Sequence, residues 1–381
     1  MRAHAIAADC VFDGCKTHED TAVLIDGSLI AAVQPQAELA KDYSVHRLPA
    51  GAWLAPGFVD LQVNGGGDVL FNDSPTPETI LTIAAAHRSF GTTAVLPTFI
   101  TDTREKTRAA IAAGQQALRI EPSVLGIHLE GPHLSPEKPG VHDPSLMRAP
   151  DDQDLEMLCT DWEGARLITL APECVPKGFI AKLVASGWHV SLGHSAATYA
   201  ETCSAMTEGL NGFTHLFNAM RPLSSREPGP IAAALETPGV WYSLIVDGYH
   251  VSPPMLRLAL RGVSQPMLVT DAMPPVGGSR SSFQLYGQDI HVAEGTCRTI
   301  EGTLAGTALD MATAVRNCVK LLQVSLPDAL RFASTHPAEF IGLGQILGKL
   351  APGYRADLVA IDAETFMVLG TWVAGAYKAA H

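Results

Sequence analysis

The sequence predicts an α/β protein: a TIM-like (β/α)8 barrel joined to a small β-sandwich domain that is built from both ends of the chain. Eight apolar runs alternate with helical segments between residues 54 and 344, which is the pattern of repeated βα units. Most of these runs are continuously apolar, as expected for parallel strands that are buried on both faces. The two ends, residues 1–53 and 345–381, both have the sequence pattern of short strands and turns. Neither end could bury much apolar surface alone, so we expect the two to pair in one domain.

The eight expected barrel strands lie within LAPGFVDLQVNG, TTAVLPTFI, SVLGIHLEGP, ARLITLAPE, WHVSLGHS, GFTHLFNAM, WYSLIVDG and PMLVTDA. Helix signals fill the gaps between them, such as the capping box formed by Thr198 and Glu201. Residues 274–303 break the alternation and predict a hairpin-like insertion before the last helices. An open doubly wound sheet is the alternative, but no glycine-rich dinucleotide turn follows the first strand.

The amino-acid composition indicates which class of protein this is and which partners are excluded. With 47% apolar and 17% charged residues, the 381-residue chain is expected to be soluble and globular with a large core. Its net charge of −13 argues against nucleic acid or an anionic membrane surface as a partner. No segment approaches the roughly 18 continuous apolar residues of a membrane span. Seven cysteines without a C-x-x-C pair fit neither a disulfide framework nor a cysteine zinc site, so we expect a cytoplasmic protein.

Residues with metal-binding and acid–base side chains stand at the ends of four predicted strands. Glu130 ends the third strand, His194 the fifth, His215 the sixth and Asp271 the eighth. In a TIM barrel these ends open on one face, so the four side chains are expected to meet there. A single histidine is more often an ordinary polar residue, but one carboxylate with two imidazoles matches an open metal site. Asp271 is followed by a proline pair instead of a helix, which favours a general base and acid over a helix cap.

The ordered motifs make the resemblance specific. The chain contains PGFVDLQVNG, HLEGP, GHS, THLFNAM, REPG, DGYH, VTDA, GTLAG, HPA and PGYRADLVAI, spread over nearly its whole length. It resembles the N-acetylglucosamine-6-phosphate deacetylase family of the amidohydrolase superfamily. The resemblance implies a metal-dependent hydrolysis of N-acetyl-D-glucosamine 6-phosphate to D-glucosamine 6-phosphate and acetate, in amino-sugar catabolism. It also implies that Glu130, His194 and His215 bind the metal and that Asp271 is the general base and acid.

The same resemblance assigns the remaining site residues. His142 corresponds to the residue that donates a hydrogen bond to the scissile carbonyl, which would stabilise a developing oxyanion. The substrate-binding positions implied are His142, Asn218, Ala219, Arg226, His250 and Leu304. In the family the arginine at the position of Arg226 reaches the site of the neighbouring subunit, so a homodimer is implied.

The first strand departs from the wider superfamily. Where many amidohydrolases carry H-x-H and bind a second metal, this chain has Gln62-x-Asn64, and amides are poor zinc ligands. We therefore expect one divalent metal per subunit, with zinc as the first choice and iron or another divalent ion as the alternative. Gln62, Asn64 and His128 are expected to form hydrogen bonds behind the metal ligands, since His128 shares a strand face with Glu130. The alternatives are that Asn64 only packs the mouth of the barrel and that His128 is itself a ligand.

Two other hypotheses remain open at this point. The chemistry could act on another substrate, either N-acetylgalactosamine 6-phosphate or a cyclic amide, although Arg226 with Asn218 makes most sense for an anionic tail. The chain could also be a metal-free, non-catalytic barrel, which the absent H-x-H favours and the four strand-end residues oppose.

Overall fold

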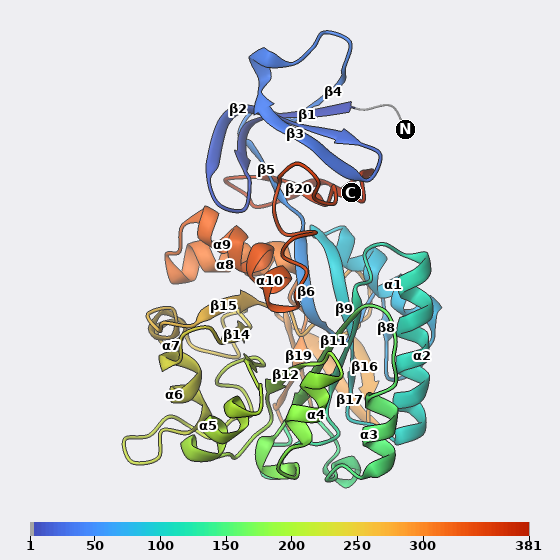
Figure 1. The fold of residues 1–381 in the computed structure, drawn as a ribbon, viewed down its shortest axis with the longest axis vertical. Coiled ribbons are helices and arrows are strands. Elements are labelled where there is room, and N and C mark those ends of the chain that lie inside the picture. The colour runs from blue at the N-terminus through green and yellow to red at the C-terminus, as the bar shows by residue number, and fades with distance from the viewer. Residues whose placement is uncertain (1–3, 381) are drawn as a thin grey trace.

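The computed structural model describes residues 4–380 and has a β-sheet domain stacked on a barrel (Figure 1). The barrel contains eight parallel strands in sequence order: β6 (Phe58–Val63), β9 (Thr92–Ile100), β10 (Gly126–Glu130), β11 (Ala165–Leu170), β12 (His189–Leu192), β13 (Gly212–Phe213), β14 (Trp241–Leu244) and β15 (Gln265–Leu268). Seven of the eight predicted apolar runs contain one of these strands whole, and β15 begins one residue before the eighth run. The predicted barrel is therefore confirmed, and its largest apolar cluster fills the space between strands and helices.

The barrel closes irregularly. β6 and β15 are the two ends of the sheet order and share no regular ladder. The closure runs instead through residues just past β15, where Val63 bridges Ala272 and the Asp271 N–H donates to the Gln62 carbonyl at 2.9 Å. We call this junction, residues 60–64 with residues 270–272, the seam.

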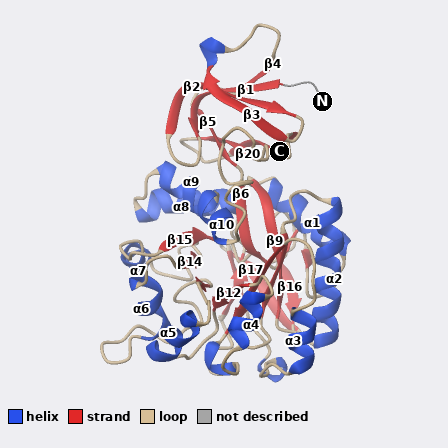
Figure 2. Ribbon diagram, viewed as in Figure 1, coloured by secondary structure: helices blue, strands red, loops and turns tan. Residues whose placement is uncertain are grey.

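Helices cover the outside of the barrel (Figure 2). They are α1 (Pro77–Arg88), α2 (Arg104–Ile120), α3 (Asp152–Leu158), α4 (Phe179–Ala185), α5 (Tyr199–Thr207), α6 (Gly229–Glu236), α7 (Pro253–Ala259), α8 (Met311–Leu322), α9 (Leu326–Ala333) and α10 (Thr335–Phe340). The capping box predicted from Thr198 and Glu201 is present at the start of α5. Among the helices of residues 4–380, none has the length and apolar character needed to cross a membrane.

Both ends of the chain contribute to the second eight-stranded sheet. It contains β1 (His4–Phe12), β2 (Thr17–Asp26), β3 (Leu29–Pro35), β4 (Ser44–Arg47), β5 (Ala52–Pro56), β20 (Leu358–Asp362), β21 (Val368–Val373) and β22 (Ala376–Ala379). The antiparallel pair β5–β20 joins the N-terminal strands to the C-terminal ones. A separate apolar cluster that includes Ile6, Leu54 and Trp372 forms the core of this sheet. The division of the chain at residues 53 and 345 stays a prediction.

The excursion after β15 is larger than the single hairpin expected from the sequence. It forms a four-stranded antiparallel sheet of β16 (Ser282–Leu285), β17 (Gln288–Ala293), β18 (Thr296–Arg298) and β19 (Leu304–Thr307). Alternate apolar side chains such as Phe283 and Ile290 pack on Met273 and Leu70, the latter in the β7 (Gly65–Gly66) and β8 (Val69–Leu70) ribbon. Thr307 bridges Ala272, so β19 returns to the seam.

Candidate metal-dependent active site

A cavity of about 170 Å³ opens at the carboxyl ends of the barrel strands. Most of the residues singled out from the sequence line it: Asn64, Glu130, His142, His194, His215, Asn218, Ala219, His250, Asp271 and Leu304. Residues separated by well over one hundred positions in the chain therefore share one small space. Three of the predicted site residues do not line it: Gln62, His128 and Arg226.

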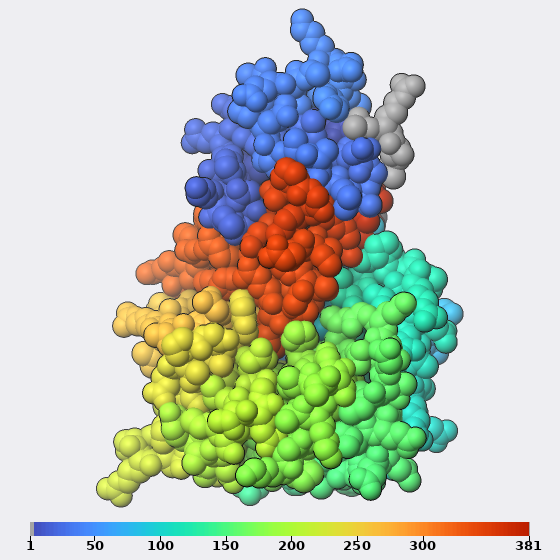
Figure 3. Space-filling model, viewed as in Figure 1, coloured from blue at the N-terminus to red at the C-terminus, as the bar shows by residue number. Residues whose placement is uncertain are grey.

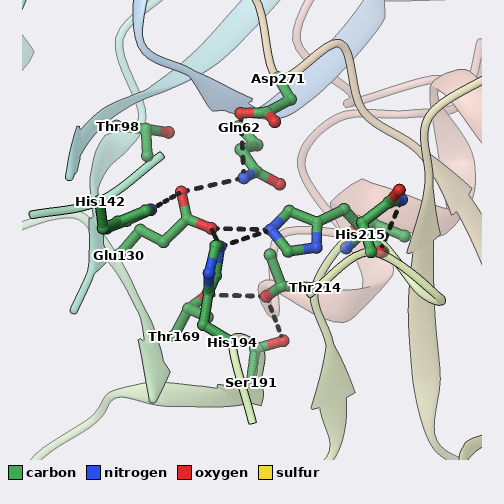
Figure 4. Close-up of polar contacts among 12 residues, drawn as sticks. Gln62, Thr98, Glu130, His142, Thr169, Ser191, His194, Thr214, His215 and Asp271 are labelled. Carbon is green, nitrogen blue, oxygen red and sulfur yellow. Dashed lines mark hydrogen bonds and ion pairs between the residues drawn. The ribbon is translucent and has the colours of Figure 1, made fainter. Parts of the chain in front are cut away.

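Three buried ligand atoms converge at the floor of the cavity (Figure 4). Glu130 Oε1 lies 2.9 Å from His215 Nε2 and 3.2 Å from His194 Nε2, and the two imidazole nitrogens are 3.2 Å apart. Ligand atoms around a tetrahedral ion with bonds of about 2.0–2.2 Å are separated by roughly 3.3 Å. The triangle thus has the size that a bound divalent cation requires.

Hydrogen bonding of His194 and the charge of Glu130 support the same fit. His194 Nδ1 lies 2.9 Å from the Lys138 carbonyl, so Nδ1 carries the proton and Nε2 presents its lone pair to the triangle. Burial alone would raise the pKa of Glu130, but its contacts with the His194 and His215 imidazoles hold that pKa well below its usual range. The carboxylate is therefore ionised. One carboxylate and two imidazoles form a donor set that suits zinc and several other divalent ions.

His142 lies beside this triangle without being part of it. Its Nε2 is 3.9 Å from Glu130 Oε2, and its Nδ1 is 2.8 Å from the Thr101 hydroxyl. That hydroxyl is 3.4 Å from its other acceptor, the Glu130 carbonyl, so we assign its proton to the shorter bond and the imidazole proton to Nε2. Burial lowers the pKa of His142 to about 3. His142 is therefore a neutral imidazole whose N–H can donate to an oxygen in the cavity.

Asp271 lies on the seam side of the cavity. Its Oδ1 accepts from Asn64 Nδ2 at 2.7 Å and from Gln62 Nε2 at 3.2 Å, and Gln62 Nε2 also donates to Glu130 Oε2 at 3.1 Å. Gln62 therefore links the two carboxylates, and Asn64 holds Asp271 alone. Burial, and next the nearby Glu130 charge, raise the pKa of Asp271 to about 6. A carboxyl group with such a pKa can both accept and return a proton near neutral pH.

The backbone is left-handed at several of these positions. His194 (φ 48°), His215 (φ 34°), Ala219 (φ 49°) and Asp271 (φ 51°) all have a positive φ. The sequence placed the histidines and Asp271 at strand ends, whereas the strands stop two or three residues earlier, at Leu192, Phe213 and Leu268. A left-handed residue outside glycine costs of order 1–3 kcal/mol, and such strain clusters at functional sites. Here it turns the side chains from the strand ends into the cavity.

Below the ligand triangle, a belt of hydroxyl groups and one imidazole links neighbouring strands, and Figure 4 labels the hydroxyl-bearing residues Thr98, Thr169, Thr214 and Ser191. His128 lies between the hydroxyls of Thr98 (3.2 Å) and Thr169 (2.8 Å), and Thr214 continues the chain from Thr169 to Ser191, each at 2.7 Å. Burial lowers the pKa of His128 to about 4, so its ring is neutral. His128 therefore takes part in the belt and lies outside the ligand triangle.

Of the residues predicted to bind the substrate, Asn218, Ala219 and His250 line the cavity, whereas Arg226 does not. The Ala219 N–H donates to no backbone carbonyl among residues 4–380, while Asn218 Nδ2 donates to the His215 carbonyl at 3.0 Å. His250 Nδ1 lies 2.6 Å from Asp247 Oδ2, which orients its ring. Arg226 is exposed and does not line the cavity of its own chain. The stretch before α6 that contains it projects at the lower left of Figure 3.

Several contributing groups escaped the sequence reasoning. Thr101, which sets the His142 tautomer, directly follows a predicted strand, so its position was an available signal. The Lys138 carbonyl that orients His194 had no signal, because any residue type offers a carbonyl. Asp60 was also missed, although a charged residue within an otherwise apolar strand was visible in PGFVDLQVNG.

Comparison with known proteins places this geometry in context. Residues 53–377 match the model of the Amidohydrolase family. The chain is 43% identical to the N-acetylgalactosamine-6-phosphate deacetylase of Shewanella sp. (strain ANA-3), over 94% of this chain and 91% of that protein. It is 36% identical to the N-acetylglucosamine-6-phosphate deacetylase of Haemophilus influenzae, over 94% and 95%. The crystal structure of N-acetylglucosamine-6-phosphate deacetylase from Pasteurella multocida superposes with a TM-score of 0.95 at 35% identity, over 99% of this chain and 100% of that one.

Proposed function

We propose a specific reaction for this chain, which belongs to the amidohydrolase family. The reaction is hydrolysis of the acetamide of N-acetyl-D-glucosamine 6-phosphate, which releases acetate and D-glucosamine 6-phosphate. The observation that carries the proposal is the convergence of Glu130, His194 and His215 beside Asp271 in one cavity. The names of the similar proteins support the substrate class.

The ligand triangle would hold one divalent cation, with zinc as the first candidate. Bound there, such a cation lowers the pKa of water and polarises a carbonyl. The amides Gln62 and Asn64 occupy the place of a second ligand pair and donate to carboxylates instead, which favours a single ion. Elemental analysis of protein purified without chelator tests this: one equivalent per subunit is expected, and either none or two would contradict it.

Asp271 moves the proton in this proposal. Its carboxylate accepts a proton from the water that attacks the acetyl carbonyl, and then delivers that proton to the sugar nitrogen as the C–N bond breaks. His142 donates its Nε2–H to the carbonyl oxygen as negative charge develops on it. Without the returned proton the leaving group would be a strongly basic amide anion.

The substrate's phosphate would lie toward Asn218, the Ala219 N–H and His250, with the loop at Leu304 against the sugar. Within residues 4–380 no lysine or arginine lines the cavity, although the proposed substrate carries a phosphate. We therefore propose a homodimer in which the exposed Arg226 of one copy reaches the cavity of the other.

Subunit mixing tests the shared site. Arg226→Ala and Asp271→Asn subunits are each expected to be impaired, and a mixed dimer recovers one site with both groups. Activity at low substrate concentration should therefore rise when the two proteins are mixed and allowed to exchange. The control mixture pairs Asp271→Asn with the double variant and should show no recovery. A lack of recovery in the first mixture, despite mixed dimers, would contradict the proposal.

The galactosamine epimer is a second candidate, because the Shewanella relative that acts on it is 43% identical and the Haemophilus relative 36%. Acetate release should be measured for both 6-phosphorylated epimers and for N-acetylglucosamine without phosphate. A higher kcat/KM for the glucosamine phosphate supports the first proposal, and a higher value for its epimer replaces it. Equal rates with and without phosphate would contradict both. A cytoplasmic location is proposed from the seven cysteines, all of which are unpaired.

A further inference from the structure

The seam contains a buried carboxyl group that the proposed reaction does not use. Asp60 lies in β6 and is fully buried. Its Oδ1 accepts from the backbone N–H of Gln62 at 3.2 Å and of Thr270 at 3.3 Å, and its Oδ2 accepts from the Thr270 hydroxyl at 2.6 Å. Among residues 4–380 no lysine, arginine or histidine forms an ion pair with it.

A carboxyl group buried in this way destabilises the closed barrel. A buried carboxyl without a cationic partner is unfavourable relative to an apolar side chain of similar size. Burial raises the pKa of Asp60 to about 7, which is the response expected of a carboxyl group in that position. The six junctions from β9 to β15 pair without register shifts, and β6 pairs with β9 through a ladder that shifts register twice. Within the described residues, none of these seven junctions between neighbouring strands is bridged by a buried carboxylate in this way. Closure alone therefore does not account for Asp60.

The residue that Asp60 holds is the neighbour of Asp271. Asp271 has a left-handed backbone and needs external restraint. Its N–H donates to the Gln62 carbonyl at 2.9 Å, and its own carbonyl accepts from the Thr307 N–H at 3.0 Å. The Thr307 hydroxyl donates to the Thr270 carbonyl at 2.6 Å. The two residues are thus tied to β6 on one side and to β19 on the other.

The hydrogen bond between the Asp60 and Thr270 side chains differs from the other contacts that hold residues 270 and 271. The bond from the Asp271 N–H to the Gln62 carbonyl is made by backbone groups, which any side chain would permit. The bond from the Thr270 N–H to Asp60 Oδ1 needs only the Asp60 side chain. The Thr270 hydroxyl bond requires both side chains, and it restrains the residue whose ψ precedes the strained φ of Asp271. Asn64 and Gln62, which contact the Asp271 carboxylate, lie on the same strand as Asp60 or directly after it. One strand therefore positions both the backbone and the carboxylate of Asp271.

We propose that Asp60 and Thr270 form a positioning pair that holds Asp271 in register with Gln62, Asn64 and the ligand triangle. The inference rests on the proposed function, in which Asp271 transfers the proton. A displacement of about 1 Å at a reacting group can lower a rate by roughly 10²-fold. Loss of the pair is therefore expected to reduce the chemical step and to leave the metal and the substrate bound.

Thr270→Val tests the pair, because valine keeps the shape of threonine and removes the hydroxyl. We expect kcat to fall by roughly 10- to 100-fold, with KM and metal content close to those of the wild type. The melting temperature should be lower, because the buried Asp60 carboxyl group loses its shortest hydrogen bond. Thr270→Ser keeps the hydroxyl and should retain kcat within about threefold. Thr93→Val is the matched control, since it removes an equally buried hydroxyl from the opposite end of β9, where it contacts the Phe58 carbonyl at 3.4 Å.

The outcomes separate the inference from the function. The inference is overturned if Thr270→Val keeps the wild-type kcat, if Thr93→Val loses as much, or if kcat falls only together with metal content. It is also overturned if Thr270→Ser is as impaired as Thr270→Val. A wild type that acts on neither epimer would overturn the proposed function and the inference with it, whereas an active wild type isolates the positioning pair.

Discussion

The two halves of the cavity are built differently. The ligand triangle stands on regularly paired strands, above a belt of neutral groups in which His128 links the hydroxyls of Thr98 and Thr169. Asp271 stands at the seam, where regular pairing is missing and the buried carboxyl of Asp60 lies behind it. A cation site requires fixed donor atoms and neutral imidazoles. A proton-transfer group requires a pKa near neutrality, which burial and a neighbouring carboxylate produce.

We call the ligand triangle the metal half of the cavity and Asp271 with the seam the seam half. The largest expected effect comes from removing a ligand of the metal half. His215→Ala removes one of three donors and leaves the negative charge of Glu130 without its 2.9 Å partner. We expect both the bound metal and acetate release to fall to background. His18→Ala, which changes a histidine on a surface hairpin, is the control and should keep both. A His215→Ala protein with a full equivalent of metal would show that the triangle is not the binding site.

Asp271→Asn breaks the seam half alone. The amide keeps an acceptor oxygen for Asn64 but cannot take up a proton, so kcat is expected to fall by about 10²- to 10⁴-fold. Metal content and the affinity for glucosamine 6-phosphate, measured by calorimetry, should stay near wild type. A wild-type kcat would remove Asp271 from the mechanism, and loss of metal would assign Asp271 to the metal half instead.

His142 lies between the two halves, and a substitution there tests whether it is a hydrogen-bond donor or a metal ligand. His142→Phe keeps a ring and removes the Nε2–H donor, so kcat is expected to fall by roughly 10²-fold. Metal content should not change, because His142 Nε2 is 3.9 Å from Glu130 and outside the triangle. Elemental analysis and steady-state kinetics of one preparation decide this. Loss of metal would make His142 a fourth ligand.

The smallest expected effect is on the pH dependence of stability. It involves two buried histidines, one behind each half of the cavity. Burial lowers the pKa of His128, in the belt, and of His87, which donates to the Gly65 carbonyl near the seam, to about 4. Below the unfolded pKa of about 6.5, the unfolded chain binds protons that the folded chain does not. Stability therefore falls as pH decreases from about 6.5 to about 4, by up to roughly 1.4 kcal/mol per pH unit for each histidine.

His87→Gln tests that contribution, since glutamine offers an N–H and does not titrate. The difference in urea midpoint between about pH 7.5 and about pH 5 should be smaller in the variant than in the wild type. An exposed histidine of β17 replaced in the same way, His291→Gln, is the control. An undiminished difference in His87→Gln would show that His87 is already protonated in the folded state.

Much of the site could be predicted because the barrel imposes a rule on position. Once eight βα units were identified, Glu130, His194, His215 and Asp271 had to approach one face, whatever their separation in the chain. The four-stranded sheet after β15 was predicted only as a hairpin, because its short polar strands give a weak periodic signal. Asp60 and Thr101 were missed because their importance depends on partners in other strands.

By itself, the sequence determined the order of the strands, the residue types at their ends and thus the kind of chemistry, since apolar periodicity and side-chain identity are local properties. The tertiary structure alone decided which ring nitrogen carries a proton, which backbone positions are left-handed, and that a buried carboxyl closes the barrel behind Asp271. Those features depend on distances between segments that lie as far apart as Asp60 and Thr270, and only the folded packing sets such distances.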